Sequence, residues 1–277
     1  MARVLLISSD VAYGHVGNAA ARFALQRLGH EVLALPTVVL SSHMGYRQVG
    51  GTRIEPQTLT GMVGALASNE ILETVDAVLT GYLPTTGHVD AAVSAIERVH
   101  AESGARRLVM VDPVLGDDPG GLYVDKAAAV AVRDRLVPLA GILTPNRFEL
   151  AWLSGAEVHD ARSAQAAARR LTSAFVLATS IPANRKAQID NVLVTASNAI
   201  RATVKRRARV PHGTGDLLAA LMLGHLLSGM SQARALGLAV GGIEAVIEAS
   251  AGAPELRLVQ SQAAWFRPKA WPVGPVG

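Results

Sequence analysis

The chain contains no cysteine, few aromatic residues and few charged ones, and each shortage excludes a kind of protein. Without cysteine, its 277 residues form no disulfide, no thiolate metal site and no cysteine nucleophile. This absence fits a reducing cytoplasm. Aromatic residues make up 4% and charged residues 17% of the chain, whereas 50% is hydrophobic. Such a composition describes a soluble protein with ample apolar material for a full core.

The sequence shows neither a targeting segment nor a membrane span. The N-terminal stretch Met1–Ile7 has one basic residue and an apolar run too short for a signal peptide. No apolar run of transmembrane length is free of charges or turn residues. We therefore expect a protein of the cytoplasm that binds no membrane.

A positive net charge is the one compositional hint of a nucleic-acid partner. The net charge is +4, and much of it lies in residues 205–209, directly before a glycine-rich turn. A basic cluster beside an anion site serves a phosphorylated ligand more simply. No zinc finger, RNA-recognition motif or basic amphipathic helix is present. We therefore expect a small-molecule partner and no nucleic acid.

Short β-type apolar runs alternate with longer helical ones along most of the chain. The expected strands are Val4–Ile7, Glu31–Leu35, Ala77–Leu79, Leu108–Val111, Gly141–Leu143, Phe175–Ala178 and Val192–Thr195. The expected helices are Gly17–Leu28, Pro56–Leu66, Val89–His100, Ala127–Val137 and Ser163–Leu171. This alternation is typical of an α/β fold with a mostly parallel sheet and helices on both faces.

The last third of the chain departs from this alternation. Ala196–Asn198 has the composition of a turn, so Ala199–Lys205 is expected to pair as a hairpin with the strand before it. Two helices, Gly215–Leu227 and Ser231–Ser250, then close the fold.

No linker divides the sequence and no internal repeat is visible, so residues 1–277 are predicted to form a single domain. The tail over residues 265–277 carries three prolines and two glycines. We expect this tail to be irregular or frayed.

The most informative motif is His212-Gly-Thr-Gly-Asp216, which the apolar run Leu217–Leu221 follows directly. Its two glycines allow a tight turn and leave backbone N–H groups uncovered. Because the apolar run is expected to be helical, these groups lie at a helix N-terminus, which attracts an anion. A carboxylate beside phosphate charge is unfavourable unless it takes the proton of an attacking hydroxyl. Asp216 is thus a candidate general base, and the alternative is an aspartate that only caps the helix.

Polar side chains follow the expected strands at the points where the strands end. In an open parallel sheet, ligands bind beyond the carboxyl ends of the strands. The polar segments at these ends are Ser8–Asp10, Thr80–Tyr82, Asp112–Pro113, Thr144–Asn146 and Thr179–Ser180. They are expected to converge along one edge of the sheet and to form a site there.

Six segments of the chain, taken in order, resemble those of the pyridoxal kinases, which belong to the ribokinase superfamily. They are Ser9–Asn18, Leu40–Tyr46, Thr80–Leu83, Asp112–Asp117, Thr144–Glu149 and Gly213–Asp216. The run Tyr13-Gly-His-Val-Gly-Asn18 narrows the resemblance from the superfamily to the pyridoxal kinases. The later segment Glu255–Gln260 is similar as well.

The resemblance implies a ribokinase-like single domain without the separate β-lid of the sugar kinases. It implies transfer of the γ-phosphate of ATP to the 5′-hydroxyl of pyridoxal, with Mg²⁺ and often K⁺. It also implies a homodimer. The first strand begins directly and no β-segment is inserted, which agrees with a fold without a lid.

For phosphoryl transfer, the resemblance makes Asp216 the catalytic base. The backbone N–H groups of Gly213, Thr214 and Gly215 are then expected to hold the transferring phosphoryl group. Asp117 is the expected Mg²⁺ contact, since hard oxygen ligands suit this ion. The residues expected beside it, near the metal and the phosphates, are Asp112, Thr144, Glu149 and Thr179. The alternative is that the aspartates cap turns and that the glutamate faces solvent.

The resemblance also assigns residues to each of the two substrates. Those expected to bind ATP are Asp112, Asn146, Glu149, Thr179, Ser180, Arg207, Arg209 and Thr214. Those expected to bind the substrate are Ser9, His43, Met44, Tyr82 and Asp216. A solvated basic edge is the alternative for the two arginines, and a purely structural role is the alternative for the histidine.

Two positions in the substrate half depart from the family's pattern. Met44 stands where a threonine usually contacts the substrate, and methionine donates no hydrogen bond. Asp10 stands where a histidine is common. Both departures affect the choice of substrate, and neither affects phosphoryl transfer.

Two other functions stay open. A kinase for a related heteroaromatic alcohol, such as hydroxymethylpyrimidine, shares the Gly-Thr-Gly-Asp chemistry but is not expected to carry the run Tyr13–Asn18. A vitamin B6 binding protein with little turnover is the alternative from another class. Met44 is the only support for it, because Asp216 and its glycines are present.

Overall fold

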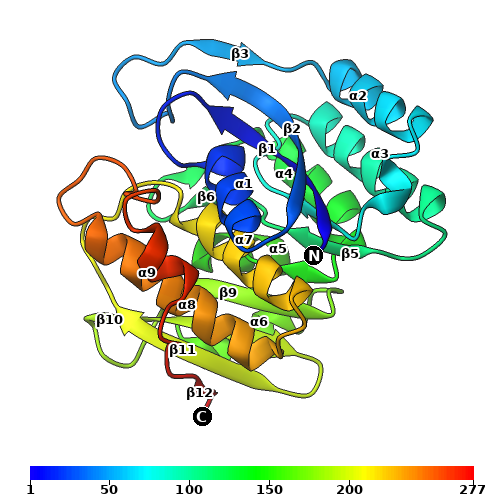
Figure 1. Cartoon of the computed structure of the whole chain (residues 1–277). Helices are drawn as coiled ribbons and strands as arrows, with labels where there is room; N and C mark the ends of the chain where they lie inside the picture. Colours follow the sequence, from blue (N-terminus) through cyan, green and yellow to red (C-terminus); the bar gives the residue numbers. More distant parts are fainter.

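The computed structural model describes all 277 residues, and its centre is one ten-stranded sheet (Figure 1). The strand order is β12-β11-β10-β9-β8-β5-β4-β1-β2-β3. The strands are β1 (Arg3–Val11), β2 (Glu31–Leu40), β3 (Gly51–Arg53), β4 (Ala77–Thr80), β5 (Leu108–Val111), β8 (Ile142–Leu143), β9 (Phe175–Pro182), β10 (Gln188–Thr195), β11 (Ala199–Lys205) and β12 (Gly274–Pro275). From β2 to β9 in this order every pairing is parallel. The predicted α/β fold with a mostly parallel sheet is confirmed.

The central strands are apolar without interruption because both of their faces are covered. β5 reads Leu-Val-Met-Val, and every residue of β4 is buried. Continuous apolar runs are what a parallel sheet between two helical layers requires. Polar residues therefore begin where the strands end, which places Thr80 and Asp112 at the carboxyl edge of the sheet.

Helices cover both faces of the sheet (Figure 1). α1, α7, α8 and α9 share one apolar core with one face, and α2 to α6 share a second core with the other. The helices are α1 (Gly17–Arg27), α2 (Pro56–Ser68), α3 (Thr86–Glu102), α4 (Lys126–Ala131), α5 (Arg147–Ser154), α6 (Ala161–Ala168), α7 (Thr214–Leu227), α8 (Gln232–Ala249) and α9 (Gln262–Phe266). None of them is both long and apolar enough to span a bilayer.

The predicted hairpin is present at one side of the sheet. β10 and β11 pair antiparallel, with Val192 opposite Arg201. The tail over residues 265–277 completes α9 and has regular structure again only in β12, which pairs with β11. This tail is packed and not frayed, because Trp265 is fully buried and the indole N–H of Trp271 donates to the carbonyl of Thr203.

Three helical segments differ from the sequence prediction, and one of them is α9, which was not predicted. Residues 127–137, expected to form one helix, form α4 followed by a π-helical turn and a short 3-10 turn. Pro138 lies in the 3-10 turn and has no N–H to continue an α-helix. α5 was not predicted. It begins with a capping box, in which Asn146 and Glu149 each accept a hydrogen bond from the other's backbone N–H.

Candidate functional site

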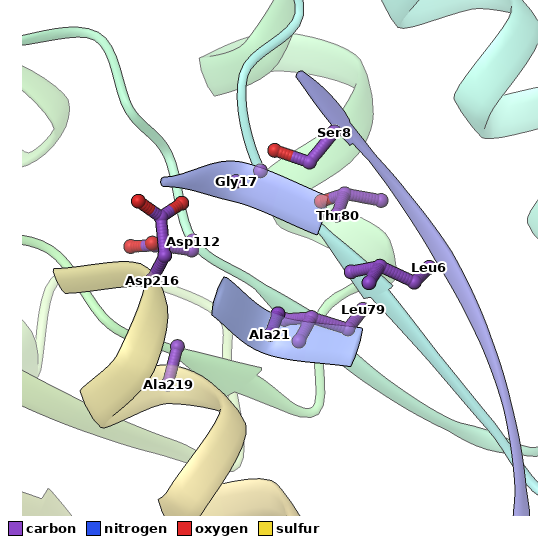
Figure 2. A pocket seen from close by; sticks show the side chains of 10 residues that line it. Leu6, Ser8, Gly17, Ala21, Leu79, Thr80, Asp112, Asp216 and Ala219 are labelled. Atoms are coloured by element: carbon purple, nitrogen blue, oxygen red, sulfur yellow. The ribbon is translucent and has the colours of Figure 1, made fainter. Parts of the chain in front are cut away.

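A small cavity lies at the carboxyl ends of β1, β4 and β5, beside the first turns of α1 and α7. Its volume is about 10 Å³, close to that of one water molecule. The lining residues are Leu6, Ser8, Gly17, Ala21, Leu79, Thr80, Gly81, Asp112, Asp216 and Ala219. Figure 2 shows the carboxylates of Asp112 and Asp216 side by side at one end of this cavity. Three of the strand ends predicted to converge therefore meet here.

α7 begins at a glycine that no other residue could replace without strain. Gly213 has a φ of +95°, and a Cβ at this position would overlap the carbonyl oxygen of His15. The start of α7 is thus fixed against the turn between β1 and α1. The backbone N–H groups of its first turn have no partner within the helix, which gives the anion-attracting terminus that the motif indicates.

Asp216 extends from the first turn of α7 to the cavity and is half-buried. Burial raises the pKa of its carboxyl group, and the backbone N–H groups of Gly17 and of Asp216 itself oppose this effect. A raised pKa makes a carboxylate a better proton acceptor. The N-cap residue of α7 is Gly213, so Asp216 does not occupy the capping position itself.

Asp112 is a second acid at the cavity, and it is buried. The hydroxyl of Thr144 donates a hydrogen bond of 2.9 Å to its Oδ1. Burial raises the pKa of Asp112 well above its usual range, and the negative charges of Glu149 and Asp216 raise it further. Glu149 and Asp216 therefore each lie close enough to Asp112 to repel its negative charge.

Glu149 is buried, although the sequence left open that it faces solvent. Its Oε1 accepts hydrogen bonds from the backbone N–H of Leu115 at 2.8 Å and of Gly116 at 3.4 Å, and its Oε2 accepts one from Asn146 at 2.9 Å. Burial raises the pKa of Glu149 to about 7, and these three N–H groups oppose the rise. Both oxygens thus hold the backbone between β5 and α5 in place.

These acids fit a cation that is shared with a ligand. A positive charge among Asp112, Glu149 and Asp216 would remove the repulsion that raises the pKa of Asp112. No three histidine or acidic side chains lie close enough together to hold a metal by themselves. Mg²⁺ needs no such cage, because it keeps several waters and takes oxygens from nucleotide phosphates.

Asp117 lies on a short hairpin that follows β5. β6 (Gly116–Asp117) pairs with β7 (Gly121–Leu122), outside the main sheet. A side chain at Gly116 would overlap the carbonyl of Gly121, so the hairpin requires this glycine. Asp117 is exposed, and after burial its interaction with Tyr123 is the next largest cause of the raised pKa of that tyrosine. The carboxylate of Asp117 is therefore open to a ligand from solvent.

The predicted nucleotide residues at the ends of β8 and β9 lie together. Asn146 and Thr179 form a backbone bridge, and the side-chain amide of Asn146 donates to the carbonyl of Gly116 at 2.7 Å. Ser180 is exposed and has a φ of +58°, which is uncommon for a serine. This edge is continuous with the hairpin that carries Asp117.

The two predicted arginines do not line the cavity. Arg207 donates a 2.7 Å hydrogen bond to Glu244 of α8, a carboxylate that is largely buried. Arg209 is exposed and forms no ion pair. Arg207 thus has a partner on α8, whereas the side chain of Arg209 is open to solvent.

Apart from Asp216, the predicted substrate residues come from the last part of β1 and from the segments that follow β2 and β4. Ser9 is half-buried at the end of β1, where it packs against Gly17 so closely that a Cβ there would overlap its side chain. Tyr82 is half-buried after β4, and burial raises its pKa. His43 and Met44 lie in the loop after β2, where Met44 is 77% exposed and contributes nothing to the cavity wall.

Two residues beside the site had been given no individual role, although Thr80 belongs to the polar segment Thr80–Tyr82 that was expected to contribute to it. Thr80 lines the cavity, and its buried hydroxyl has no hydrogen-bond partner. Its place as the last residue of β4, after three apolar residues, is the strand-end signal that selected the segment Thr80–Tyr82. Glu255 lies 3.0 Å from His43 although 212 positions separate the two residues. No local pattern in the sequence relates them.

The chain is similar to known kinases over almost its full length. A family model described as phosphomethylpyrimidine kinase matches residues 33–256. Pyridoxal kinase PdxY of Corynebacterium diphtheriae is 35% identical, over 96% of each chain. A pyridoxine/pyridoxal/pyridoxamine kinase of Bordetella avium is 39% identical, over 84% of this chain and 80% of its own. The solved pyridoxal kinase of Leishmania donovani in complex with ADP and pyridoxamine has a TM-score of 0.94, 29% identity and coverage of 100% of both chains.

Proposed function

This chain belongs to the pyridoxal kinase family, which makes it an ATP-dependent kinase of vitamin B6, and we propose that Asp216 activates the 5′-hydroxyl of pyridoxal for attack on ATP. The observation that carries this mechanism is the placement of Asp216. It is a carboxylate in the first turn of α7, at the edge of a cavity, with a pKa raised by burial.

In the proposed reaction, the hydroxyl oxygen attacks the γ-phosphorus while its proton passes to Asp216. The bond from the γ-phosphorus to the bridging oxygen breaks, and ADP leaves with the bonding electrons. The backbone N–H groups of Gly213, Thr214 and Gly215 bind the transferring phosphoryl group. Their alignment is fixed before the reaction because Gly213 packs directly on the backbone of His15.

We assign the cation site to Asp117, Asp112 and Thr144, with Glu149 behind them. When bound there, Mg²⁺ neutralises charge that develops on the phosphates. Glu149 holds the backbone N–H groups of Leu115 and Gly116, so it also fixes the hairpin that presents Asp117. The same surroundings suit a monovalent cation such as K⁺.

The remaining assignments follow the two sides of the cavity. On the nucleotide side we place Asn146, Thr179, Ser180, Arg207 and Arg209. On the vitamin side we place Ser9, Tyr82, His43 and Met44. Support for this division is that the first set lies around β8, β9 and the start of α7, and the second around β1, β2 and β4.

A coupled assay that measures ADP release tests the proposal. Pyridoxal, pyridoxine, pyridoxamine and hydroxymethylpyrimidine are offered separately with ATP and Mg²⁺. We expect turnover with pyridoxal that disappears in Asp216→Asn. If none of the B6 vitamers is phosphorylated, the proposed substrate is wrong. If turnover is undiminished in Asp216→Asn, the proposed role of Asp216 as the base is wrong.

A second candidate substrate is hydroxymethylpyrimidine. The family model that matches residues 33–256 carries the name of phosphomethylpyrimidine kinase, and a pyrimidine alcohol could use the same base and phosphoryl site. Faster turnover of hydroxymethylpyrimidine than of every B6 vitamer would establish this candidate. Tight B6 binding without turnover would instead indicate a binding protein.

We also propose that residues 1–277 act as one catalytic domain, in the cytoplasm and as a homodimer. Support for the single domain is the continuous sheet, which contains both β1 and β12. Light scattering coupled to size exclusion tests the dimer, since a monomer mass at assay concentration would contradict it.

A further inference from the structure

The loop between β2 and β3, residues 41–50, is closed at its base and otherwise weakly tied to the protein. At the base, the backbone N–H of Ser41 donates to the carbonyl of Gly50, and the N–H of Gly50 donates to the hydroxyl of Ser41. Inside the loop, the N–H of Tyr46 donates to the carbonyl of His43. Residues 47–49 form no hydrogen bond at all.

Both hydrogen bonds that join residues 42–49 to the rest of the chain end on one atom, Oε1 of Glu255. The hydroxyl of Tyr46 donates to it at 2.7 Å, and Nε2 of His43 lies 3.0 Å away. Nδ1 of His43 accepts a hydrogen bond from the backbone N–H of Gly45, so Nε2 carries the ring proton and donates it to Glu255. One carboxylate oxygen thus accepts both of the hydrogen bonds that tie the loop tip to the rest of the chain.

Glu255 itself is firmly placed. It lies between α8 and α9, is 8% exposed, and is followed by Leu256 and Leu258, which are both buried in the core. Its second oxygen, Oε2, has no hydrogen-bond partner and lies against Gly14, where a Cβ would overlap it. A buried carboxylate is costly unless donors compensate it, and here the donors are the two side chains of the loop.

The loop tip lies against the phosphoryl-transfer turn. The ring of His43 packs on the ring of His212 with centroids 4.4 Å apart, and His212 directly precedes Gly213. A Cβ at Gly45 would lie 2.8 Å from the ring of His43 and 3.1 Å from that of His212, so the absence of a side chain at Gly45 permits this packing. Glu255, which does not line the cavity, therefore fixes the position of the loop 41–50 relative to the start of α7.

We propose that Glu255 is a positioning residue that clasps the loop 41–50 onto the vitamin side of the active site. It touches neither substrate. It fixes His43 and its neighbours so that the substrate half of the pocket is formed before pyridoxal binds. This inference rests on the proposed function for its kinetic part, whereas its structural part can be tested without any substrate.

The structural test measures hydrogen exchange of the backbone N–H groups of residues 43–50. Glu255→Ala removes the acceptor, and Glu255→Gln keeps an oxygen at the same place. We expect exchange in the loop to become at least tenfold faster in Glu255→Ala and to stay within threefold of wild type in Glu255→Gln. Glu248→Ala, at an exposed glutamate of α8, is the matched control. Unchanged exchange in a folded Glu255→Ala protein would overturn the clasp.

The kinetic test compares the same variants in pyridoxal phosphorylation. We expect KM for pyridoxal to rise at least tenfold in Glu255→Ala, with KM for ATP and kcat within threefold of wild type, and we expect Glu255→Gln to restore most of the loss. If the loop exchanges faster but KM for pyridoxal is unchanged, the positioning role is wrong. If wild type itself does not turn over pyridoxal, the proposed function fails and the exchange result still decides the clasp.

Tyr46→Phe is a milder variant that tests the proposal even if Glu255→Ala does not fold. It removes one of the two donors from a side chain that is partly exposed. We expect a two- to tenfold rise in KM for pyridoxal, and no further rise when Tyr46→Phe is added to Glu255→Ala. If Tyr46→Phe raises KM by the same factor in Glu255→Ala as in wild type, the hydroxyl does not act through Glu255 and the proposal is overturned.

Discussion

Asp112 and Asp216 reach the same water-sized cavity from the end of β5 and from α7, where burial raises the pKa of Asp112 and the negative charges of Glu149 and Asp216 raise it further (Figure 2). Two carboxylates in one partly buried site oppose each other's ionisation. The site therefore favours a positive charge near the two carboxylates. A cation that binds together with the nucleotide would reduce their repulsion. The two acids differ in their proposed roles. Asp216 lies at the start of α7, where the phosphoryl group is expected, and is the proposed base, whereas Asp112 is assigned to the cation site.

Asp216→Asn should nearly abolish phosphorylation while ATP still binds. An amide accepts no proton from the hydroxyl, and loss of a general base costs about 10² to 10⁴ in rate. Steady-state kinetics give kcat, and calorimetric titration gives the affinity for ATP. Glu248→Gln, on the exposed side of α8, is the control. A variant rate within a few-fold of wild type would remove Asp216 from the mechanism.

Asp117→Ala should shift the dependence of activity on Mg²⁺ and leave pyridoxal binding almost unchanged. Asp117 is exposed on the β6–β7 hairpin, so its loss removes an oxygen ligand without opening the core. The measurement is the Mg²⁺ concentration for half-maximal rate, which we expect to rise about tenfold, a loss of about 1.4 kcal/mol. Asp134→Ala, at an exposed acid in the π-helical turn after α4, is the control. Superimposable Mg²⁺ curves would show that Asp117 only shapes its turn.

Met44→Thr should lower KM for pyridoxal with little change in kcat. Threonine restores a hydrogen bond worth about 0.5–1.5 kcal/mol, which corresponds to at most about tenfold in affinity. Because Met44 is 77% exposed, the change should leave the melting temperature unaltered. Met62→Thr, at a methionine that is 38% exposed, controls for general surface effects. A KM that rises, or that is unchanged for every vitamer, would show that position 44 does not face the substrate.

His225 should make the protein lose stability between pH 6.5 and 4. Burial, with repulsion from His30 and Arg234, lowers the pKa of His225 to about 4, whereas the unfolded chain has the ordinary value of about 6.5. In that interval the unfolded state binds more protons, so this stabilising contribution is full above pH 6.5 and disappears as the pH falls toward 4. The loss is on the order of 3 kcal/mol, since the pKa difference of about 2.5 units is worth about 1.4 kcal/mol per unit.

His225→Leu should flatten this dependence, because leucine does not titrate and the Nε2 of His225 has no partner to lose. Denaturant unfolding at several pH values from 4 to 7.5 gives the free energy of unfolding for variant and wild type. His159→Gln, whose histidine side chain is 71% exposed, should keep the wild-type dependence. Equal slopes for His225→Leu and wild type would assign the acid sensitivity to other groups.

The sequence predicted most of the sheet because burial on both faces leaves a clear signature. The bounds of β5 and β11 agree with the expected ranges Leu108–Val111 and Ala199–Lys205. The helix α5 escaped prediction because it is short and begins at residues that also suit a ligand-binding loop. Its capping box uses Asn146 and Glu149, and the sequence prediction had interpreted these two residues as ligand-binding residues and not as the start of a helix.

The site was predictable where chemistry follows a strand end or a glycine turn. Asp112 and Asp216 carry such local signals, and the structure brings them to one cavity. Glu255 carries none. Its contacts join segments more than 200 positions apart, as the separation of 209 positions from Tyr46 shows, and such a pairing depends on the whole fold. Burial of Glu149 was equally out of reach, because only the packed structure decides which oxygens meet backbone donors.

The backbone contact between Gly213 and His15 has a consequence for how such an enzyme can change over evolutionary time. The strand-to-helix turn at His15 and the start of α7 touch through main-chain atoms, which every amino-acid sequence possesses. Their mutual placement is thus insulated from most mutations, so long as the glycine persists. The tip of the loop that carries His43 and Met44 is joined to the rest of the chain by side-chain hydrogen bonds, and side chains change more readily than main-chain contacts. New alcohol substrates could therefore be acquired by altering that loop while the phosphate-handling turn is inherited unchanged.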